Sequence, residues 1–242
     1  MLQLKTPTAF MRLSSPHPTM KNRPTRRVAF MQEAAAEPTR PLSIPKSTID
    51  FDAISDVPCF IQGTRIQTAH GALPVETLKK GDAVITRDRG VQKIRWIGRK
   101  KVQTTVADAP VHIAKGAIGN DSDLLLSPDH RVLLSGWRCR KIAGADEVTA
   151  AARDLMNGRD ICQTTGGPIE YFHFAFDNHE IIIANGAFAE SFHPGSVSAE
   201  DVSVKTREDL VSAFPVIGAD PASYGPKVRP ETKPHEARMI RP

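Results

Sequence analysis

Short β-patterned segments separated by turn residues recur through the middle of this 242-residue chain, and they constrain its fold most strongly. Apolar, β-branched or aromatic residues dominate each segment, and Gly, Asn, Asp or Pro follows it. Strand signals spaced about 8–12 residues apart are typical of β-sandwiches and β-barrels. The pattern therefore predicts an all-β domain over about residues 59–195.

The individual elements follow from periodicity and turn chemistry. Asn185-Gly186 predicts a tight turn with positive φ. Residues 149–156 predict a short helix that ends before Asn157-Gly158. Residues 124–134 predict two buried strand pieces with a polar bend between them. The other predicted strands cover residues 64–68, 83–86, 91–102, 111–113, 169–176 and 181–184.

Composition divides the chain into three parts. Residues 1–56 are basic and rich in Pro, and we expect them to form a disordered leader. Residues 57–195 form the β domain. Residues 196–242 form a C-terminal extension, with a helix at 200–214 followed by a Pro-rich part that packs irregularly.

Charge and apolar content exclude several kinds of partner. Residues 1–50 hold eight Lys/Arg and three Asp/Glu, so they account for the whole net charge of +5, and the rest of the chain is neutral. We therefore expect no nucleic-acid partner. We also expect no membrane partner, because no apolar run approaches the roughly 18 residues of a membrane span. Without a secretory signal, the default expectation is a cytoplasmic location, with non-classical export left open.

The cysteines indicate a thiol rather than a disulfide framework. The chain has only three, and an odd, sparse count fits a reducing compartment or a catalytic thiol. No C-x-x-C pair occurs, and the spacing of five of the chain's eight histidines matches no common zinc motif. The sequence therefore implies no metal and no cofactor. Those histidines are His112, His130, His173, His179 and His193.

Cys59 opens the first patterned segment and follows a peptide carbonyl, that of Pro58. Its thiol can attack that carbonyl through a five-membered ring, because nucleophile and target are covalently tethered. The products are a thioester on sulfur and a free amine on the same residue. The step needs a proton for the departing nitrogen, stabilisation of the developing oxyanion and a base for the thiol.

Three further residues are candidates for this chemistry. His130 is the first choice to protonate or polarise the Pro58–Cys59 amide, and Ser127, three residues earlier, orients it or contacts the scissile carbonyl. His179 is the second acid/base candidate. Taken singly, each histidine also fits an ordinary turn histidine, and Cys59 fits a small buried apolar residue.

The three motifs together resemble the Hedgehog/intein (Hint) family, in a bacterial Hint-like variant. They are Cys-Phe-x-x-Gly-Thr, Ser-Pro-x-His-Arg, and His-Glu-x-x-x-Ala-Asn-Gly-x-x-x-x-Ser-Phe-His, over about residues 57–195. The resemblance implies a horseshoe-like β domain and autocatalytic, single-turnover self-processing. It matches Cys59 to the family's nucleophile, Ser127 and His130 to its Thr-x-x-His block, and His179 to the histidine of a later block.

One departure from the family changes the implied reaction. Inteins end in His-Asn followed by Cys, Ser or Thr, whereas here Pro194 follows His193. The residues for the second half of protein splicing, in which the Asn side chain cyclises and cuts the downstream bond, are therefore missing. The resemblance implies instead that Cys59 forms a thioester with the segment 1–58, the chain's own substrate. An outside nucleophile, which is water, a thiol, an amine or an alcohol, then resolves it.

Two other classes of function remain open from the sequence. A non-catalytic Hint-like binding or structural module would keep the β scaffold and bury Cys59 as an inert thiol. A cysteine hydrolase acting on other molecules would need an open substrate cleft beside Cys59.

Overall fold

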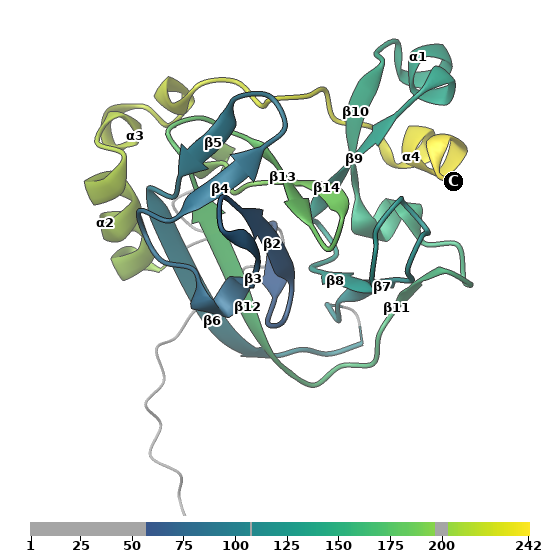
Figure 1. Cartoon of the computed structure of the whole chain (residues 1–242), viewed down its shortest axis with the longest axis horizontal. Coiled ribbons are helices and arrows are strands. Elements are labelled where there is room, and N and C mark those ends of the chain that lie inside the picture. Colours follow the sequence, from purple (N-terminus) through teal and green to yellow (C-terminus); the bar gives the residue numbers. More distant parts are fainter. Residues whose placement is uncertain (1–56, 107, 197–202) are drawn as a thin grey trace, which may run out of the picture. The chain divides into compact units, whose positions relative to one another are not determined.

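The computed structural model describes residues 57–106, 108–196 and 203–242. The expected leader, residues 1–56, lies outside the described residues. Two antiparallel β-sheets hold the strands, which confirms the predicted all-β fold (Figure 1).

The first sheet has six strands in the order β11-β7-β8-β1-β12-β6. Its two longest strands, β6 and β12, pair along their whole length and lie side by side in Figure 1. The strands are β1 (Phe60–Ile61), β6 (Trp96–Gln103), β7 (Val111–Ile113), β8 (Leu124–Leu126), β11 (Ile161–Gln163) and β12 (Pro168–Ala175).

The second sheet has the order β10-β9-β14-β13-β2-β4-β5. Its eighth strand, β3, pairs with β2 and is not part of this order. The sheet therefore combines the start, the middle and the end of the β region. Its strands are β2 (Arg65–Thr68), β3 (Gly71–Pro74), β4 (Ala83–Thr86), β5 (Gly90–Lys93), β9 (Arg131–Ser135), β10 (Glu147–Ala151), β13 (Ile181–Ala184) and β14 (Ala187–Glu190).

The helices are short, and several lie in the C-terminal extension. None in the described ranges has the length and apolar content that a membrane crossing requires. The α-helices are α1 (Trp137–Ala143), α2 (Val204–Ala213), α3 (Val216–Ala219) and α4 (Pro234–Ile240). The 3₁₀ helices are η1 (Val75–Thr77), η2 (Ala152–Leu155), η3 (Pro194–Ser196) and η4 (Pro221–Tyr224).

Helix α2 lies within the helix predicted over residues 200–214. It begins after its capping residue, Ser203. The Ser203 side chain accepts a hydrogen bond from the Thr206 N–H, which satisfies one of the donors exposed at the helix start. Residues 200–202 lie outside the described residues. Helix α1, which follows β9 after Gly136, is not among the elements predicted from the sequence.

The single long strand predicted over residues 91–102 is wrong, because the chain changes sheets within it. The Ile94 N–H donates to the Asp82 carbonyl at 2.9 Å, and the next N–H, of Arg95, donates to the Ala175 carbonyl of β12 at 2.8 Å. Ile94 and Trp96 are buried in two different apolar clusters. A straight strand cannot serve both clusters, so it breaks into β5 and β6.

The helix predicted over residues 149–156 is also wrong, since β10 and then η2 occupy that stretch. One edge of β10 pairs with β9. On the other edge, the Thr149 N–H donates to the Pro230 carbonyl and the Thr149 carbonyl accepts from the Thr232 N–H, both at 2.9 Å. Backbone pairing on both edges outweighs the helix propensity of the neighbouring alanines.

The turn predicted at Asn185-Gly186 is confirmed and joins β13 to β14. The φ angles are 46° for Asn185 and 79° for Gly186. A Cβ on Gly186 would lie 2.8 Å from the Asp121 backbone nitrogen, so only glycine fits. The Asn185 side chain accepts from the Arg65 N–H at 2.7 Å, which fastens the turn to β2.

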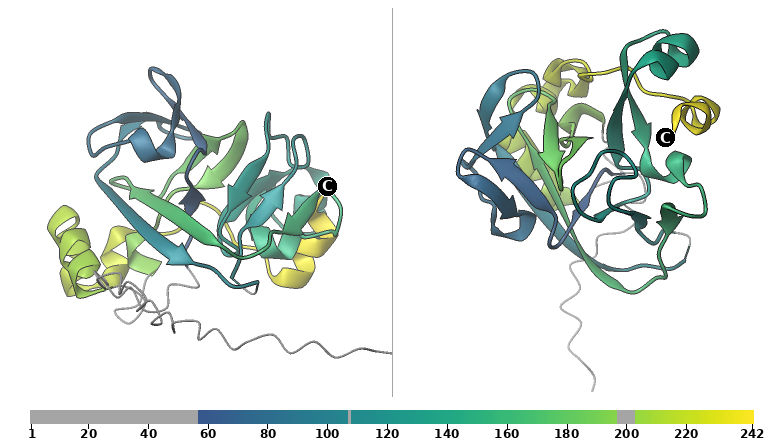
Figure 2. Two further views of the ribbon diagram at one scale, coloured as in Figure 1. Left: turned by 90° about the horizontal axis from the view of Figure 1, so that it is seen from below. Right: turned by 45° about the vertical axis from the view of Figure 1, so that its right-hand side comes forward.

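The C-terminal extension packs closely, contrary to the irregular packing expected of its Pro-rich part. Tyr224 donates its hydroxyl to the Phe176 carbonyl at 2.9 Å, and Arg229 forms ion pairs with Asp88 and Glu147. Helix α4 lies beside α1 in both Figure 1 and Figure 2. The extension is therefore part of the folded β domain.

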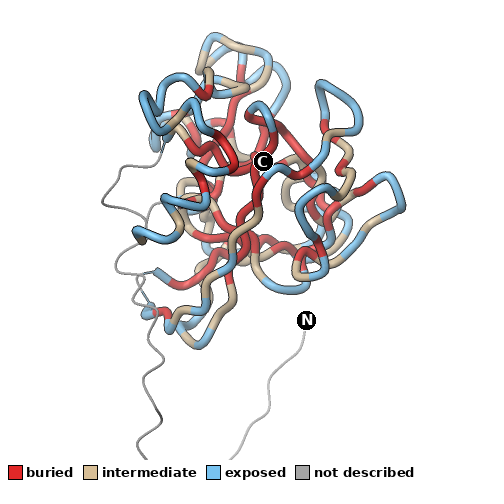
Figure 3. The backbone as a smooth tube through the Cα atoms, turned by 90° about the vertical axis from the view of Figure 1, so that its left-hand side faces the viewer, coloured by how far each residue is buried: buried red, intermediate tan, exposed pale blue. Residues whose placement is uncertain are grey.

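Figure 3 shows buried residues running through the interior of the fold. The buried apolar side chains form two clusters. The larger lies between the sheets and includes Phe60 and Phe174, whose rings stack with centroids 5.4 Å apart. The smaller includes Cys59, together with Leu210 and Phe214 from the extension. Leu210 and Phe214 thus belong to the same apolar cluster as the candidate nucleophile.

We expect Ile240→Ala to lower the free energy of unfolding by about 2–5 kcal/mol, as large-to-small changes in cores do. Ile240 is only 5 % exposed and belongs to the larger cluster. Met239, its neighbour, is 59 % exposed, so Met239→Ala should change stability by less than about 0.5 kcal/mol. Urea unfolding of both variants checks this, and equal effects would contradict the packing of α4.

Candidate functional site

Strand pairing brings the candidate nucleophile between two other strands. Phe60 of β1 lies opposite Leu126 of β8 and opposite Phe172 of β12. Both pairings are antiparallel, so moving back one residue to Cys59 means moving forward one residue on each partner. Cys59 therefore lies between Ser127 and His173.

Ser127 contacts the scissile amide directly. The Cys59 N–H donates to the Ser127 Oγ at 2.9 Å, and the Ser127 N–H donates to the Cys59 carbonyl at 3.1 Å. The Ser127 hydroxyl in turn donates to the Val57 carbonyl at 3.2 Å. The structure thus brings together two of the predicted site residues, Cys59 and Ser127, at the nitrogen of the Pro58–Cys59 bond.

His173 contacts both the scissile carbonyl and the thiol. Its Nδ1 lies 3.0 Å from the Pro58 carbonyl oxygen, and its Nε2 lies 3.7 Å from the Cys59 Sγ. A carbonyl oxygen only accepts, so Nδ1 carries the proton and Nε2 presents its lone pair to the thiol. Burial lowers the pKa of His173 to about 4, which keeps the ring neutral at pH 7.

In the sequence, His173 is only one of five histidines whose spacing fits no zinc motif. No local motif distinguishes it, because it belongs to a continuous strand. The signal that identifies it is the register of β12 against β1, which sequence alone did not provide. In the described residues, no group of three or more His, Cys, Asp or Glu side chains is arranged to hold a metal ion.

The Cys59 thiol is neutral in this environment. It is 4 % exposed, and its S–H donates to the Val57 carbonyl at 3.0 Å. Burial raises the pKa of the Cys59 thiol well above its usual range, although the Ser127 hydrogen bond acts in the opposite direction. Attack by this sulfur therefore requires a base, and the Nε2 of His173 is in position to accept the proton.

His130 is buried against Phe60, the residue after Cys59. Its N–H donates to the Ser127 carbonyl at 3.0 Å, and its ring centroid lies 4.3 Å from that of Phe60. Neither ring nitrogen meets a hydrogen-bond partner among the described residues. Burial lowers the pKa of His130 to about 3, opposed by backbone groups of Cys59 and Glu190. Its predicted role at the amide nitrogen stays a prediction.

His179 lies away from the thiol, and backbone groups occupy both of its ring nitrogens. Its Nε2 donates to the Ser191 carbonyl at 3.0 Å, and its Nδ1 accepts from the Val228 N–H at 3.1 Å. Burial lowers the pKa of His179 to about 3. These contacts fix the ring between β13 and the C-terminal extension, and its predicted acid/base role stays a prediction.

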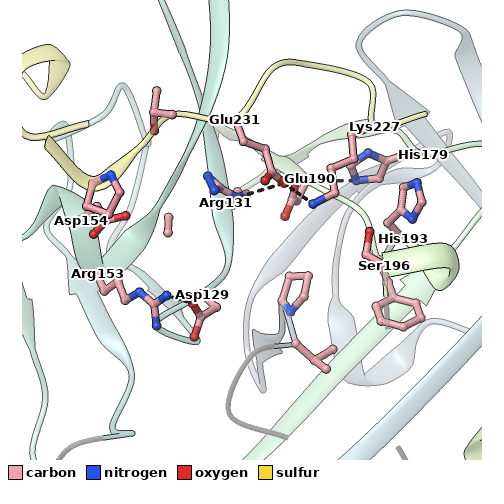
Figure 4. A pocket seen from close by; sticks show the side chains of 16 residues that line it. Asp129, Arg131, Arg153, Asp154, His179, Glu190, His193, Ser196, Lys227 and Glu231 are labelled. Atoms are coloured by element: carbon pink, nitrogen blue, oxygen red, sulfur yellow. Dashed lines mark hydrogen bonds and ion pairs between the residues drawn. The ribbon is translucent and has the colours of Figure 1, made fainter. Parts of the chain in front are cut away.

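A cavity of about 300 Å³ leads to the scissile segment and is lined by Val57 and Pro58 at one side. Figure 4 shows His179, Glu190 and His193 gathered in another part of it, near Lys227. The C-terminal extension contributes part of the wall, from 227 to 234. The cavity therefore borders Pro58, whereas Cys59, Ser127 and His173 are not among its lining residues.

Buried titratable groups predict how stability varies with pH. His130, His173 and His179 have folded pKa values of about 3, 4 and 3, against 6.5 for an exposed histidine. The unfolded chain therefore binds more protons below pH 6.5, and stability is lost as the pH falls from 6.5 toward 3. Glu190 acts oppositely, since burial raises its pKa from 4.5 to about 8 and stability falls as the pH rises between those values.

We therefore expect the urea midpoint to be highest near pH 6.5. Between pH 4.5 and 6.5 the buried histidines outnumber the buried acids, since burial also lowers the pKa of His193 and raises the pKa of Glu180, so the acid side should be the steeper. Urea titrations from pH 4.5 to 8.5 check this. A midpoint that rises steadily on going from pH 6.5 to 4.5 would contradict the burial of neutral histidines.

The chain is similar to several solved structures. Solved structures of similar fold include a bacterial intein-like domain from Clostridium thermocellum, at 16 % identity and a TM-score of 0.41, covering 55 % of this chain and 97 % of that one. A DnaB intein from Synechocystis sp. is 15 % identical with a TM-score of 0.35, covering 55 % and 98 %. No curated protein matches the chain.

A sequence model of the Hint domain matches residues 58–196, beginning at the scissile proline and ending just past His193. The match covers more than half of the chain. The resemblance noted in the three sequence motifs is thereby confirmed, and this chain belongs to the Hint domain family, a family of self-processing domains.

Proposed function

We propose that this chain is a self-processing Hint domain that cleaves its own Pro58–Cys59 bond through a thioester on Cys59, without protein splicing. Residues 57–195 form the autoprocessing domain and residues 196–242 form an extension that completes it. The leader 1–58 is the segment released or transferred.

One observation carries the proposal: a single neutral imidazole contacts both reacting groups. His173 holds the Pro58 carbonyl oxygen through Nδ1 at 3.0 Å and faces the Cys59 Sγ through Nε2 at 3.7 Å. One side chain can thus stabilise the oxyanion and accept the thiol proton. An inert core histidine would not need both contacts at a peptide bond that precedes a cysteine.

The first step follows from these contacts. The thiol proton moves to the His173 Nε2 as sulfur attacks the Pro58 carbonyl carbon, and Nδ1–H donates to the oxygen as its negative charge grows. The C–N bond then breaks, and the proton passes to the Cys59 nitrogen. The Ser127 Oγ, 2.9 Å from that nitrogen, stays hydrogen-bonded to it as the amine forms.

A non-catalytic Hint-like module is the second candidate, and the state of the thiol favours it. Cys59 is buried and neutral, and its S–H donates to the Val57 carbonyl at 3.0 Å rather than to the His173 ring. In such a module the leader stays attached and the thiol serves as a small apolar side chain.

Intact mass of the full chain distinguishes the two functions. The chain is expressed whole and its mass followed with and without added thiol or hydroxylamine. Self-processing predicts fragments 1–58 and 59–242, formed faster with either nucleophile. A single intact species under every condition would exclude self-processing in the isolated protein.

A further inference from the structure

The cavity beside the scissile bond has an acidic group that the first reaction step does not use. Glu190 ends β14 and lines the same cavity as Val57 and Pro58. It is only 6 % exposed. In the described part of the chain, no Lys or Arg nitrogen lies within 4.0 Å of its carboxylate, and the one ion-pair partner found is the His179 Nε2 at 3.7 Å.

His179 does not neutralise this carboxyl. The His179 Nε2 proton is already donated to the Ser191 carbonyl, and burial keeps the ring uncharged. A buried carboxylate without a cation lowers the stability of the folded state, so stability does not explain why Glu190 is there. Buried acids of this kind, placed in a cavity beside a reacting bond, are candidates for proton transfer.

The charged groups around Glu190 come from β9 and from the C-terminal segment. Arg131 of β9 and Lys227 of the C-terminal segment favour its ionised form, and Glu231 opposes it. Glu231 forms ion pairs with both cations, at 3.2 Å from the Arg131 Nε and at close contact with the Lys227 Nζ. Figure 4 shows these groups around the Glu190 side chain. The cations are thus engaged elsewhere, and Glu190 faces the cavity.

The lining of the cavity indicates what enters it. Apart from Val57, Pro58, Ala151, Phe192 and Pro234, the lining side chains are polar or charged. Its volume of about 300 Å³ corresponds to roughly ten waters at about 30 Å³ each. It therefore has room for several water molecules beside charged side chains.

We propose that Glu190 is the general base that activates a water molecule in this cavity to hydrolyse the Cys59 thioester. This rests on the proposed function, because it requires the thioester to form. The water oxygen bonds to the Pro58 carbonyl carbon, and one water proton goes to the Glu190 carboxylate. The C–S bond breaks, sulfur leaves as the Cys59 thiolate, and that thiolate takes up a proton. Pro58 is released as a carboxylic acid.

The test separates thioester formation from its hydrolysis. Full-length Glu190→Gln is compared with the unaltered chain, with and without hydroxylamine, an α-nucleophile that needs no base. Cleavage in buffer alone should fall about 100-fold, within the usual range for a general base. Cleavage with hydroxylamine should stay at the unaltered rate. In H₂¹⁸O, fragment 1–58 should gain one ¹⁸O.

The pH profile adds a readout that a structural role would not change. Burial raises the pKa of Glu190 to about 8, so cleavage in buffer should rise as the pH passes through that value and the carboxyl ionises. The Gln variant should lack this rise. Glu170→Gln, an acid on β12 outside the cavity lining, is the matched control and should behave like the unaltered chain.

Three results would overturn the assignment. Unchanged cleavage of Glu190→Gln in buffer would show that another group activates water. Loss of hydroxylamine cleavage as well would place Glu190 in the first step. If cleavage in buffer falls in His193→Gln but not in Glu190→Gln, the base is His193. The Nδ1 of His193 has no hydrogen-bond partner among the described residues. If the unaltered chain gives no fragments with hydroxylamine, the proposed function itself has failed.

Discussion

Cys59→Ala should abolish cleavage at the Pro58–Cys59 bond completely, in buffer and with hydroxylamine. The reaction has no other tethered nucleophile, because Cys139 is buried in the separate larger cluster and Cys162 hydrogen-bonds to the Arg159 carbonyl. Alanine keeps the backbone, so the Ser127 contact with the residue 59 N–H can remain. The measurement is intact mass over several days.

The matched control is Cys162→Ala, which removes a thiol of intermediate exposure from β11. It should cleave at the unaltered rate. Circular dichroism and urea unfolding of both variants establish that they fold. Fragments 1–58 and 59–242 from folded Cys59→Ala would show that cleavage does not proceed through sulfur, and the thioester mechanism would be abandoned.

His173→Gln should slow thioester formation by about 10²–10⁴-fold, the usual contribution of a positioned acid/base group. A glutamine amide can still donate to the Pro58 carbonyl, but it cannot take the thiol proton. The neutral ring, held by a pKa of about 4, is the form that accepts a proton at pH 7. The rate is measured by trapping with hydroxylamine, which reports thioester formation.

The control is His112→Gln, because His112 lies on β7 and contacts Asp123, outside the site. That variant should react at the unaltered rate. Equal rates for His173→Gln and His112→Gln would remove His173 from the mechanism. The base would then have to be sought at His130, whose ring nitrogens are unoccupied among the described residues.

Much of the fold followed from local chemistry. The strands over residues 83–86, 111–113 and 181–184 match β4, β7 and β13 residue for residue. Alternation and turn residues act within a few positions, so the sequence itself carries that information. The Asn185-Gly186 turn is likewise local, because positive φ is a property of those residue types.

Elements set by distant partners could not be predicted in the same way. Residues 149–151 form a strand because β9 and residues 230–232 pair with both edges, and the break at residues 94–95 reflects two separate apolar clusters. The extension packs closely because its polar groups meet backbone groups far away in the sequence. In each case the free energy comes from long-range contacts that override local propensity.

The sequence by itself determined which bond is proposed for cleavage, which thiol is the candidate nucleophile and which hydroxyl, at residue 127, accompanies it. A thiol that follows a peptide carbonyl and a Ser-x-x-His block are both visible in short stretches of sequence. Only the tertiary structure put His173 on both the carbonyl and the thiol, and Glu190 at the cavity beside them. Their positions depend on strand register and on the buried environment that sets their proton affinity. Both arise only when segments more than a hundred residues apart pack together.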